Sequence, residues 1–150
     1  MSLIDTVNAD IKTAMKNKVE VDLRALRGIK SALLLAQTEK GASDTISEEK
    51  EIQILQRLVK QRKESLDIYS KQGREDLAAT ESEEIEVIER YLPEQLSEED
   101  LKKLLSEIIT RVGATGPGDM GKVMGAATKE LSGKADGKTV SALVRSLLQG

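Results

Sequence analysis

The 150-residue sequence contains no cysteine and no histidine, and two tyrosines are its only aromatic residues. These absences exclude disulfides, thiol nucleophiles, zinc sites built from Cys and His, and catalytic triads that use histidine. Because Phe and Trp are missing, we expect an aliphatic core. No apolar run approaches the roughly 20 residues of a membrane span, and the N-terminus does not resemble a secretory signal. We therefore expect a cytoplasmic protein with no metal, no cofactor and no membrane partner.

The charged residues nearly balance, with 23 basic and 26 acidic side chains and a formal net charge of −3. A general polyanion binder carries a clear basic excess, so this balance argues against that class. It leaves room for a local basic patch. Charged residues make up 33% of the chain, which is typical of a helix-rich protein in water.

Apolar residues recur with helical spacing along the whole chain, and no segment has the alternation of a strand. The pattern predicts an all-α fold of seven helices. They are expected from Ser2 to about Asn17, about Asp22 to Gly41, Ser47 to Gln72, Glu75 to Pro93, Ser97 to Gly113, Asp119 to Gly133, and from Asp136 onward. The third helix is the longest, at about 37 Å for ~1.5 Å per residue, and is the expected spine of the N-terminal part.

Two helical subdomains are predicted, 1–93 and 94–150, because Pro93 stops a helix and Ser97 can cap a new one. The first holds four helices and the second holds three short ones. The third and fourth helices are separated by a turn of a few residues around Gly73, so we expect them to be antiparallel neighbours. Gly28 lies inside the second helix, which predicts a close approach of another helix at that point.

The segment GPGDMGKVMG at 116–125 is a glycine-rich loop at the start of a helix, a place where backbone N–H groups and Lys122 can hold an anion. It lacks the GK[ST] ending and the preceding strand of a nucleotide-binding loop. A flexible turn with a helix cap at Asp119 is one interpretation, and a contact with RNA phosphate or with a protein is the other.

An acidic cluster and one arginine stand out in the third and fourth helices. The cluster consists of Glu81, Glu83, Glu84, Glu86 and Glu89. These carboxylates spread around a helix, so we expect a solvated face and no metal site. Glu81 and Arg62 are exceptions because each lies on an apolar stripe. We predict a structural ion pair between Arg62 and Glu81, with Glu84 as the second choice of partner; the alternative is that both side chains reach solvent separately.

The segment from Gly113 to Gly150 has a slight basic excess, with five basic residues against three acidic ones. The candidate nucleic-acid-binding residues are Lys122, Lys129, Lys134, Lys138 and Arg145. No aromatic residue is present here to stack on bases, so any RNA binding would use phosphate and shape contacts. The alternative is an ordinary solvated surface.

Several motifs together resemble the GatB/YqeY family over nearly the whole chain. They are LRALRGIKSA (23–32), KQRKES through YLP (60–93), GKVMG (121–125) and LSGKADGKTVSALV (131–144). The resemblance implies two all-helical subdomains and kinship with the tail of GatB, a subunit of the amidotransferase that converts glutamyl-tRNA or aspartyl-tRNA to the amidated form. That tail resembles a tRNA-contacting module. The resemblance also carries a label of carbon–nitrogen ligase activity with glutamine as amido-N-donor.

Three functions remain open from the sequence. The first is a non-catalytic module that binds tRNA or a complex related to tRNA amidation or aminoacylation. The second is a protein-interaction adaptor without RNA contact. The third is the carbon–nitrogen ligase activity itself, which we rank last because the chain has no P-loop, no cysteine nucleophile and no glycine-serine amidase motif. We assign no catalytic residue.

Overall fold

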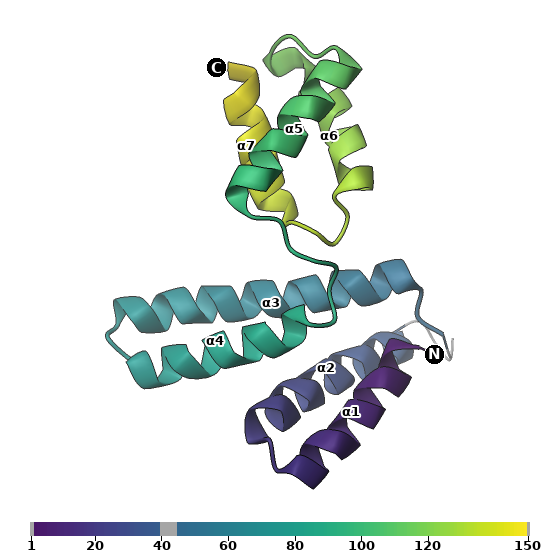
Figure 1. Cartoon of the computed structure of the whole chain (residues 1–150), viewed down its shortest axis with the longest axis vertical. Coiled ribbons are helices and arrows are strands. Elements are labelled where there is room, and N and C mark those ends of the chain that lie inside the picture. Colours follow the sequence, from purple (N-terminus) through teal and green to yellow (C-terminus); the bar gives the residue numbers. More distant parts are fainter. Residues whose placement is uncertain (1, 40–44, 150) are drawn as a thin grey trace. The chain divides into compact units, whose positions relative to one another are not determined.

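The computed structural model describes residues 2–39 and 45–149, and all regular structure in these ranges is helical (Figure 1). The helices are α1 (Leu3–Asn17), α2 (Glu20–Glu39), α3 (Glu48–Lys71), α4 (Glu75–Glu89), α5 (Glu98–Val112), α6 (Met120–Glu130) and α7 (Gly137–Gln149), with a 3₁₀ turn at Pro117–Asp119. The prediction of an all-α protein is confirmed. In the described ranges no helix is long and apolar enough to cross a membrane.

Local hydrogen bonds at the helix ends explain most of these boundaries. Ser2 and Asp5 form a reciprocal capping box at α1, and the hydroxyls of Ser47 and Ser97 accept hydrogen bonds from backbone N–H groups in the first turns of α3 and α5. The N–H groups of residues 90–92 bond carbonyls three residues back, so α4 tightens and ends before Pro93. The predicted helix end at Gly41 and the loop after it fall on residues 40–44, outside the described ranges.

The chain divides into two compact units, Met1–Leu92 and Pro93–Gly150. This division is consistent with the expected subdomains 1–93 and 94–150, and their folding as independent domains stays a prediction. In the first unit α1 pairs with α2, α3 pairs with α4, and α2 packs against both helices of the second pair. The long α3 of 24 residues is the expected spine helix.

Both cores are aliphatic, as the composition predicts. In the first unit the fully buried residues include Ile29 and Leu33 of α2, Leu55 of α3 and Ile88 of α4. In the second unit the core comes from one face each of α5, α6 and α7; it comprises Leu101, Leu105, Ile108, Val123, Ala127, Leu131, Val140, Val144 and Leu148. Burying a Leu or Ile side chain contributes about 1.5–3 kcal/mol, so these stripes hold the helices together.

Candidate functional site

The five predicted nucleic-acid-binding residues all lie on the surface of the C-terminal unit. Lys122 and Lys129 are two turns apart on the face of α6 opposite its buried residues, and Lys138 and Arg145 are arranged in the same way on α7. Lys134 lies in the turn between these helices. Within residues 93–149 the ion pairs within 4 Å are Lys102–Glu98 and Arg111–Glu130, and none of the five takes part in them. Lys122 is near enough to Asp119 to help lower the pKa of that carboxyl. Their charges are available to a ligand, and RNA binding by them stays a prediction.

The glycine-rich loop does not form an enclosed anion site. The Asp119 carboxylate accepts hydrogen bonds from the N–H (2.9 Å) and the hydroxyl (3.4 Å) of Thr115. The expectation that the Asp119 side chain caps α6 is therefore wrong, because this carboxylate closes the preceding loop instead. The Thr115 N–H lowers the pKa of Asp119, which stays ionised at neutral pH. A fixed negative charge at the start of α6 disfavours an anion there and supports the interpretation as a turn.

The predicted structural residues meet in a charged cluster that joins α2, α3 and α4. Arg62 Nη1 lies 2.8 Å from Glu84 Oε2 and 3.4 Å from Glu81 Oε2. Arg24 of α2 approaches from the other side, with its Nε 3.1 Å from Glu84 Oε1 and its Nη2 3.3 Å from Glu83 Oε2. The structure thus brings Arg62 to both expected carboxylates, with the shorter contact to Glu84. Glu84 is the carboxylate that bridges three helices.

The expectation that the acidic cluster lies on a solvated face is wrong for Glu84, which is only 5% exposed. Glu84 is seven residues after Leu77 and four before Ile88, so it belongs to the apolar stripe of α4. That spacing is visible in the sequence and could have identified the buried carboxylate. In the described ranges no three acidic side chains converge in a way that could hold a metal ion.

Gly28 leaves the space that the Arg62 side chain fills. A Cβ atom at Gly28 would lie 3.3 Å from Arg62 Nη2, tighter than ordinary van der Waals contact. The Nε of Arg62 is buried and has no hydrogen-bond partner among the described residues, so the guanidinium is held from its Nη1 side. The sequence did not reveal the part played by Arg24. It lies one turn from Gly28 on the same face of α2, and that coincidence was the available signal.

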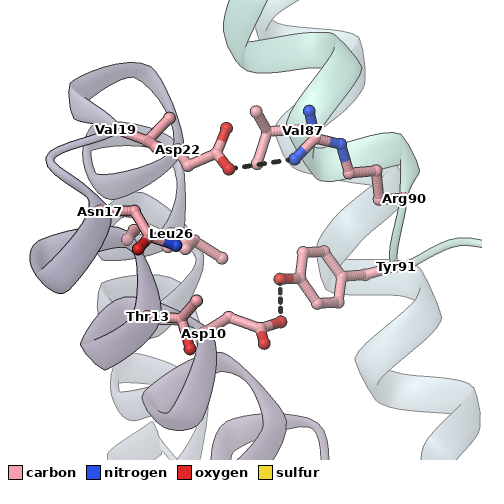
Figure 2. A pocket seen from close by; sticks show the side chains of 10 residues that line it. Asp10, Thr13, Asn17, Val19, Asp22, Leu26, Val87, Arg90 and Tyr91 are labelled. Carbon is pink, nitrogen blue, oxygen red and sulfur yellow. Dashed lines mark hydrogen bonds and ion pairs between the residues drawn. The ribbon is translucent and has the colours of Figure 1, made fainter.

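A cavity of about 280 Å³ lies between the α1–α2 hairpin and the end of α4, all within the first unit (Figure 2). Two polar contacts cross it. The Tyr91 hydroxyl donates a hydrogen bond to Asp10, and Arg90 Nη1 lies 3.2 Å from Asp22 Oδ2. Burial and the hydrogen bond to Asp10 raise the pKa of Tyr91, so its phenol stays protonated near neutral pH. Sequence reasoning missed this cavity because its walls come from distant segments, and the two contacts across it join residues 68 and 81 positions apart.

Comparisons with known proteins place these features in a family context. Residues 4–148 match the family model described as Yqey-like protein. A protein of Clavispora lusitaniae, altered inheritance of mitochondria protein 41, mitochondrial, is 30% identical over 134 residues, covering 87% of this chain and 75% of that protein. The protein of the same name from Saccharomyces cerevisiae (strain YJM789) is 29% identical over 145 residues, covering 91% and 72%.

A different relative shares only one segment with the chain. One subunit of the glutamyl-tRNA(Gln) amidotransferase of Thermococcus gammatolerans is 43% identical over 58 residues, which is 36% of this chain and 9% of that subunit. The corresponding subunit from Thermococcus sibiricus matches over the same length at 45% identity. The resemblance stated from the sequence motifs is thereby confirmed at the level of the family.

Proposed function

The chain belongs to the YqeY-like protein family, and from that premise we propose that it is a non-catalytic helical module that binds tRNA, alone or in complex with an enzyme of tRNA amidation or aminoacylation. One observation carries the proposal. The five basic side chains of the C-terminal unit are exposed, and none of them forms an ion pair within 4 Å among the described residues. Unpaired surface cations are what an RNA backbone needs, because neutralising phosphates releases condensed counterions.

The partial match to an amidotransferase subunit also supports a tRNA-binding module. The name of that relative includes glutamyl-tRNA(Gln), and the shared segment is 58 residues long, about 9% of the subunit. A segment of that size fits an accessory helical module better than a complete active site. The spacing of the cations also fits a backbone contact, since residues seven apart on a helix lie about 10 Å apart along its axis and can reach different phosphates.

Binding of labelled tRNA measured by fluorescence anisotropy tests this proposal. The test variant reverses four lysines together: Lys122→Glu, Lys129→Glu, Lys134→Glu and Lys138→Glu. We expect the logarithm of the wild-type association constant to fall linearly with the logarithm of the salt concentration. Each phosphate contact should contribute about −0.7 to −0.9 to the slope. The variant should lose detectable binding, because four attractive contacts become repulsive.

A matched control separates a specific surface from overall charge. It reverses four exposed lysines of the first unit, Lys12, Lys16, Lys60 and Lys63, and so changes the net charge by the same amount. We expect this control to keep most of the wild-type affinity. Equal loss in both variants would point to unspecific charge attraction, and undiminished binding by the test variant would contradict the proposed surface.

A protein-interaction adaptor without RNA contact is the second candidate. Exposed apolar side chains on the first unit favour it, notably Leu35 (62% exposed), Met15 (56%) and Ile68 (53%). Crosslinking in a cell extract, followed by recovery of both RNA and protein, distinguishes the two functions. Recovery of a defined protein partner without RNA would favour the adaptor, whereas tRNA in the recovered material would favour the module proposed first.

The place of the protein in the cell is a separate part of this proposal. We keep the expectation of a cytoplasmic protein as a prediction. Two of the relatives described above are mitochondrial by name, so the family is not confined to one compartment. Fractionation of cells that produce the chain with a small C-terminal tag would decide it.

A further inference from the structure

The connecting segment, residues 93–96, is hydrogen-bonded to the turn between α6 and α7, and both belong to the C-terminal unit (Figure 1). Gln95 donates from Nε2 to the carbonyl of Gly133 at 2.6 Å and to the carbonyl two residues before it at 2.8 Å. The backbone N–H of Leu96 donates to the carbonyl of Lys134 at 3.0 Å. Two consecutive carbonyls of the turn are therefore held by two consecutive residues of the connecting segment.

These bonds fix the main chain at Lys134. Its N–H donates to the carbonyl of Leu131 at 2.9 Å and its carbonyl accepts from Leu96, so both of its main-chain polar groups are bonded inside the unit. Gly133, the residue before it, is buried and has a φ of 78°, a conformation in which a side chain would be strained. The Lys134 side chain is exposed. The turn therefore presents one cation to solvent from a main chain that is held in place.

Lys134 lies between two other predicted RNA-binding residues. Lys129 is in the last turn of α6, Lys138 is in the first turn of α7, and both are exposed. The turn that joins the two helices thus gathers three cations at one end of the α6–α7 pair. Each contact between a lysine and a phosphate adds to RNA affinity, so a displaced turn would cost the surface one contact.

We propose that Gln95 is a positioning residue for the RNA-binding surface: its amide holds the α6–α7 turn so that Lys134 reaches a phosphate together with Lys129 and Lys138. This role rests on the proposed function, since it concerns the same basic surface. Gln95 has no amide hydrogen left for the RNA, because both are donated to carbonyls of the chain. It acts on binding through Lys134.

Binding of labelled tRNA over a series of salt concentrations tests this role. Gln95→Met removes both amide hydrogen bonds but keeps the neutral charge and nearly the length of the side chain, and Lys134→Ala removes the cation itself. Loss of one phosphate contact should weaken binding about fivefold at 0.15 M salt and make the logarithmic salt slope shallower by about 0.7–0.9. We expect this result for both variants. The matched control is Gln61→Met, at an exposed position of α3 in the first unit, which should bind as the wild type does.

The double variant separates positioning from general stabilisation of the unit. We expect Gln95→Met to have no further effect on affinity in the background of Lys134→Ala, because the cation that it positions is gone. A purely structural role would weaken binding by the same factor in both backgrounds and leave the salt slope of Gln95→Met unchanged. That result would overturn the proposal.

NMR spectra of the full ¹⁵N-labelled chain verify the fold of each variant. In Gln95→Met we expect shifted amide signals at residues 93–97 and 131–136, with the other signals of the C-terminal unit in place. Gln95→Asn keeps the amide but is one carbon shorter, so it should lose the bond to Gly133 and bind tRNA as Gln95→Met does. Loss of the folded unit in both variants would show a structural role and would overturn the proposal.

The wild type distinguishes this role from the proposed function. Absence of tRNA binding by the wild-type chain would contradict the proposed function and the positioning role together. Binding by the wild type that is equally strong in Gln95→Met and Gln95→Asn, with the same salt slope, would overturn the positioning role alone.

Discussion

At Glu84, charges from three helices meet in a position with little access to water. Arg62 and Arg24 each contact one of its oxygens, at 2.8 and 3.1 Å. Removing charges from water is costly, and the mutual attraction of the partners offsets that cost only while the set is complete. Removing one charged side chain of the cluster should therefore lower the stability of the first unit more than removing an arginine and its carboxylate partner together.

A double-mutant cycle measures this sensitivity. We predict that Arg62→Met and Glu84→Leu each lower the free energy of unfolding by about 2–3 kcal/mol, below the roughly 3–5 kcal/mol of a fully buried pair. Arg62→Met leaves the buried Glu84 with one cationic partner, and Glu84→Leu leaves the partly buried Arg62 with Glu81 alone. The double variant should lose clearly less than the sum. Glu81→Leu should cost less than Glu84→Leu, since its contact with Arg62 is longer at 3.4 Å. Urea unfolding of the four variants supplies the values, and strictly additive losses would show that the side chains act independently.

Tyr91 gives a prediction for alkaline pH. Burial and Asp10 raise its pKa above the ordinary value of 10.0, so the folded protein holds this proton more tightly than the unfolded chain does. The resulting stabilisation is fully present below about pH 10 and is lost as the pH rises above that value. We therefore expect the unfolding free energy of the wild type to fall more steeply above about pH 10 than that of Tyr91→Phe.

Ultraviolet titration provides a direct check on the same group. The chain has two tyrosines, so Tyr69→Phe leaves Tyr91 as the only phenol. Its absorbance should change at a pH above the range of a free tyrosine. Ionisation together with free tyrosine, or equal alkaline slopes for wild type and Tyr91→Phe, would contradict the assignment of a half-buried phenol bonded to Asp10.

At the scale of the helices, Gly28 lowers the helical propensity of α2 but leaves room for the Arg62 side chain of α3. Replacing a helical glycine by alanine ordinarily stabilises by about 1 kcal/mol. At Gly28 the new methyl would press on Arg62 Nη2 at 3.3 Å, so we predict that Gly28→Ala gains much less than that. In the background of Arg62→Met the gain should return, because the guanidinium is gone.

Gly125→Ala in α6 is the matched control for this prediction. A Cβ atom at Gly125 would meet nothing within 4 Å, so the ordinary gain of about 1 kcal/mol is expected there. Urea unfolding followed by NMR signals of each unit keeps the two sites separate. A full gain for Gly28→Ala in the wild-type background would mean that Arg62 moves aside freely.

The helices themselves were predictable because their signals are local. Ser2, Ser47 and Ser97 mark three starts, and their side-chain hydrogen bonds agree with the sequence interpretation. The prediction for Asp119 failed because its carboxylate had two possible partners nearby. It lies at the start of α6 but accepts a hydrogen bond from the Thr115 N–H and does not cap the helix.

The candidate sites were harder to predict than the helices. The apolar stripes of α3 and α4 predicted the contact of Arg62 with Glu81 or Glu84. The contact of Arg24 with Glu84 depends on how α2 packs against these two helices, which the stripes do not reveal. The Asp10–Tyr91 contact joins residues 81 positions apart, and periodicity carries no information about such pairs.

For the whole molecule, amide transfer by the chain alone is open to a direct test. The sequence has no cysteine or histidine and no nucleotide-binding loop of the GK[ST] type. We predict that the purified chain, given glutamate-charged tRNA, glutamine and ATP, forms amidated tRNA no faster than a reaction without protein. A complete amidotransferase in the same assay is the positive control. Turnover that responds to substitutions within this chain would contradict the prediction and revive the ligase function.

The contact between Gly28 and Arg62 also has an evolutionary consequence. A Cβ atom at position 28 would lie 3.3 Å from the guanidinium at position 62, so a side chain at 28 requires that guanidinium to shift. We expect the two positions to covary among members of the family, with arginine at 62 accompanied by glycine at 28. A lineage that has lost the arginine is free to acquire alanine at 28 and gain helical propensity. Frequent coexistence of a bulky residue at 28 with arginine at 62 in an alignment would show that these lineages carry the guanidinium elsewhere.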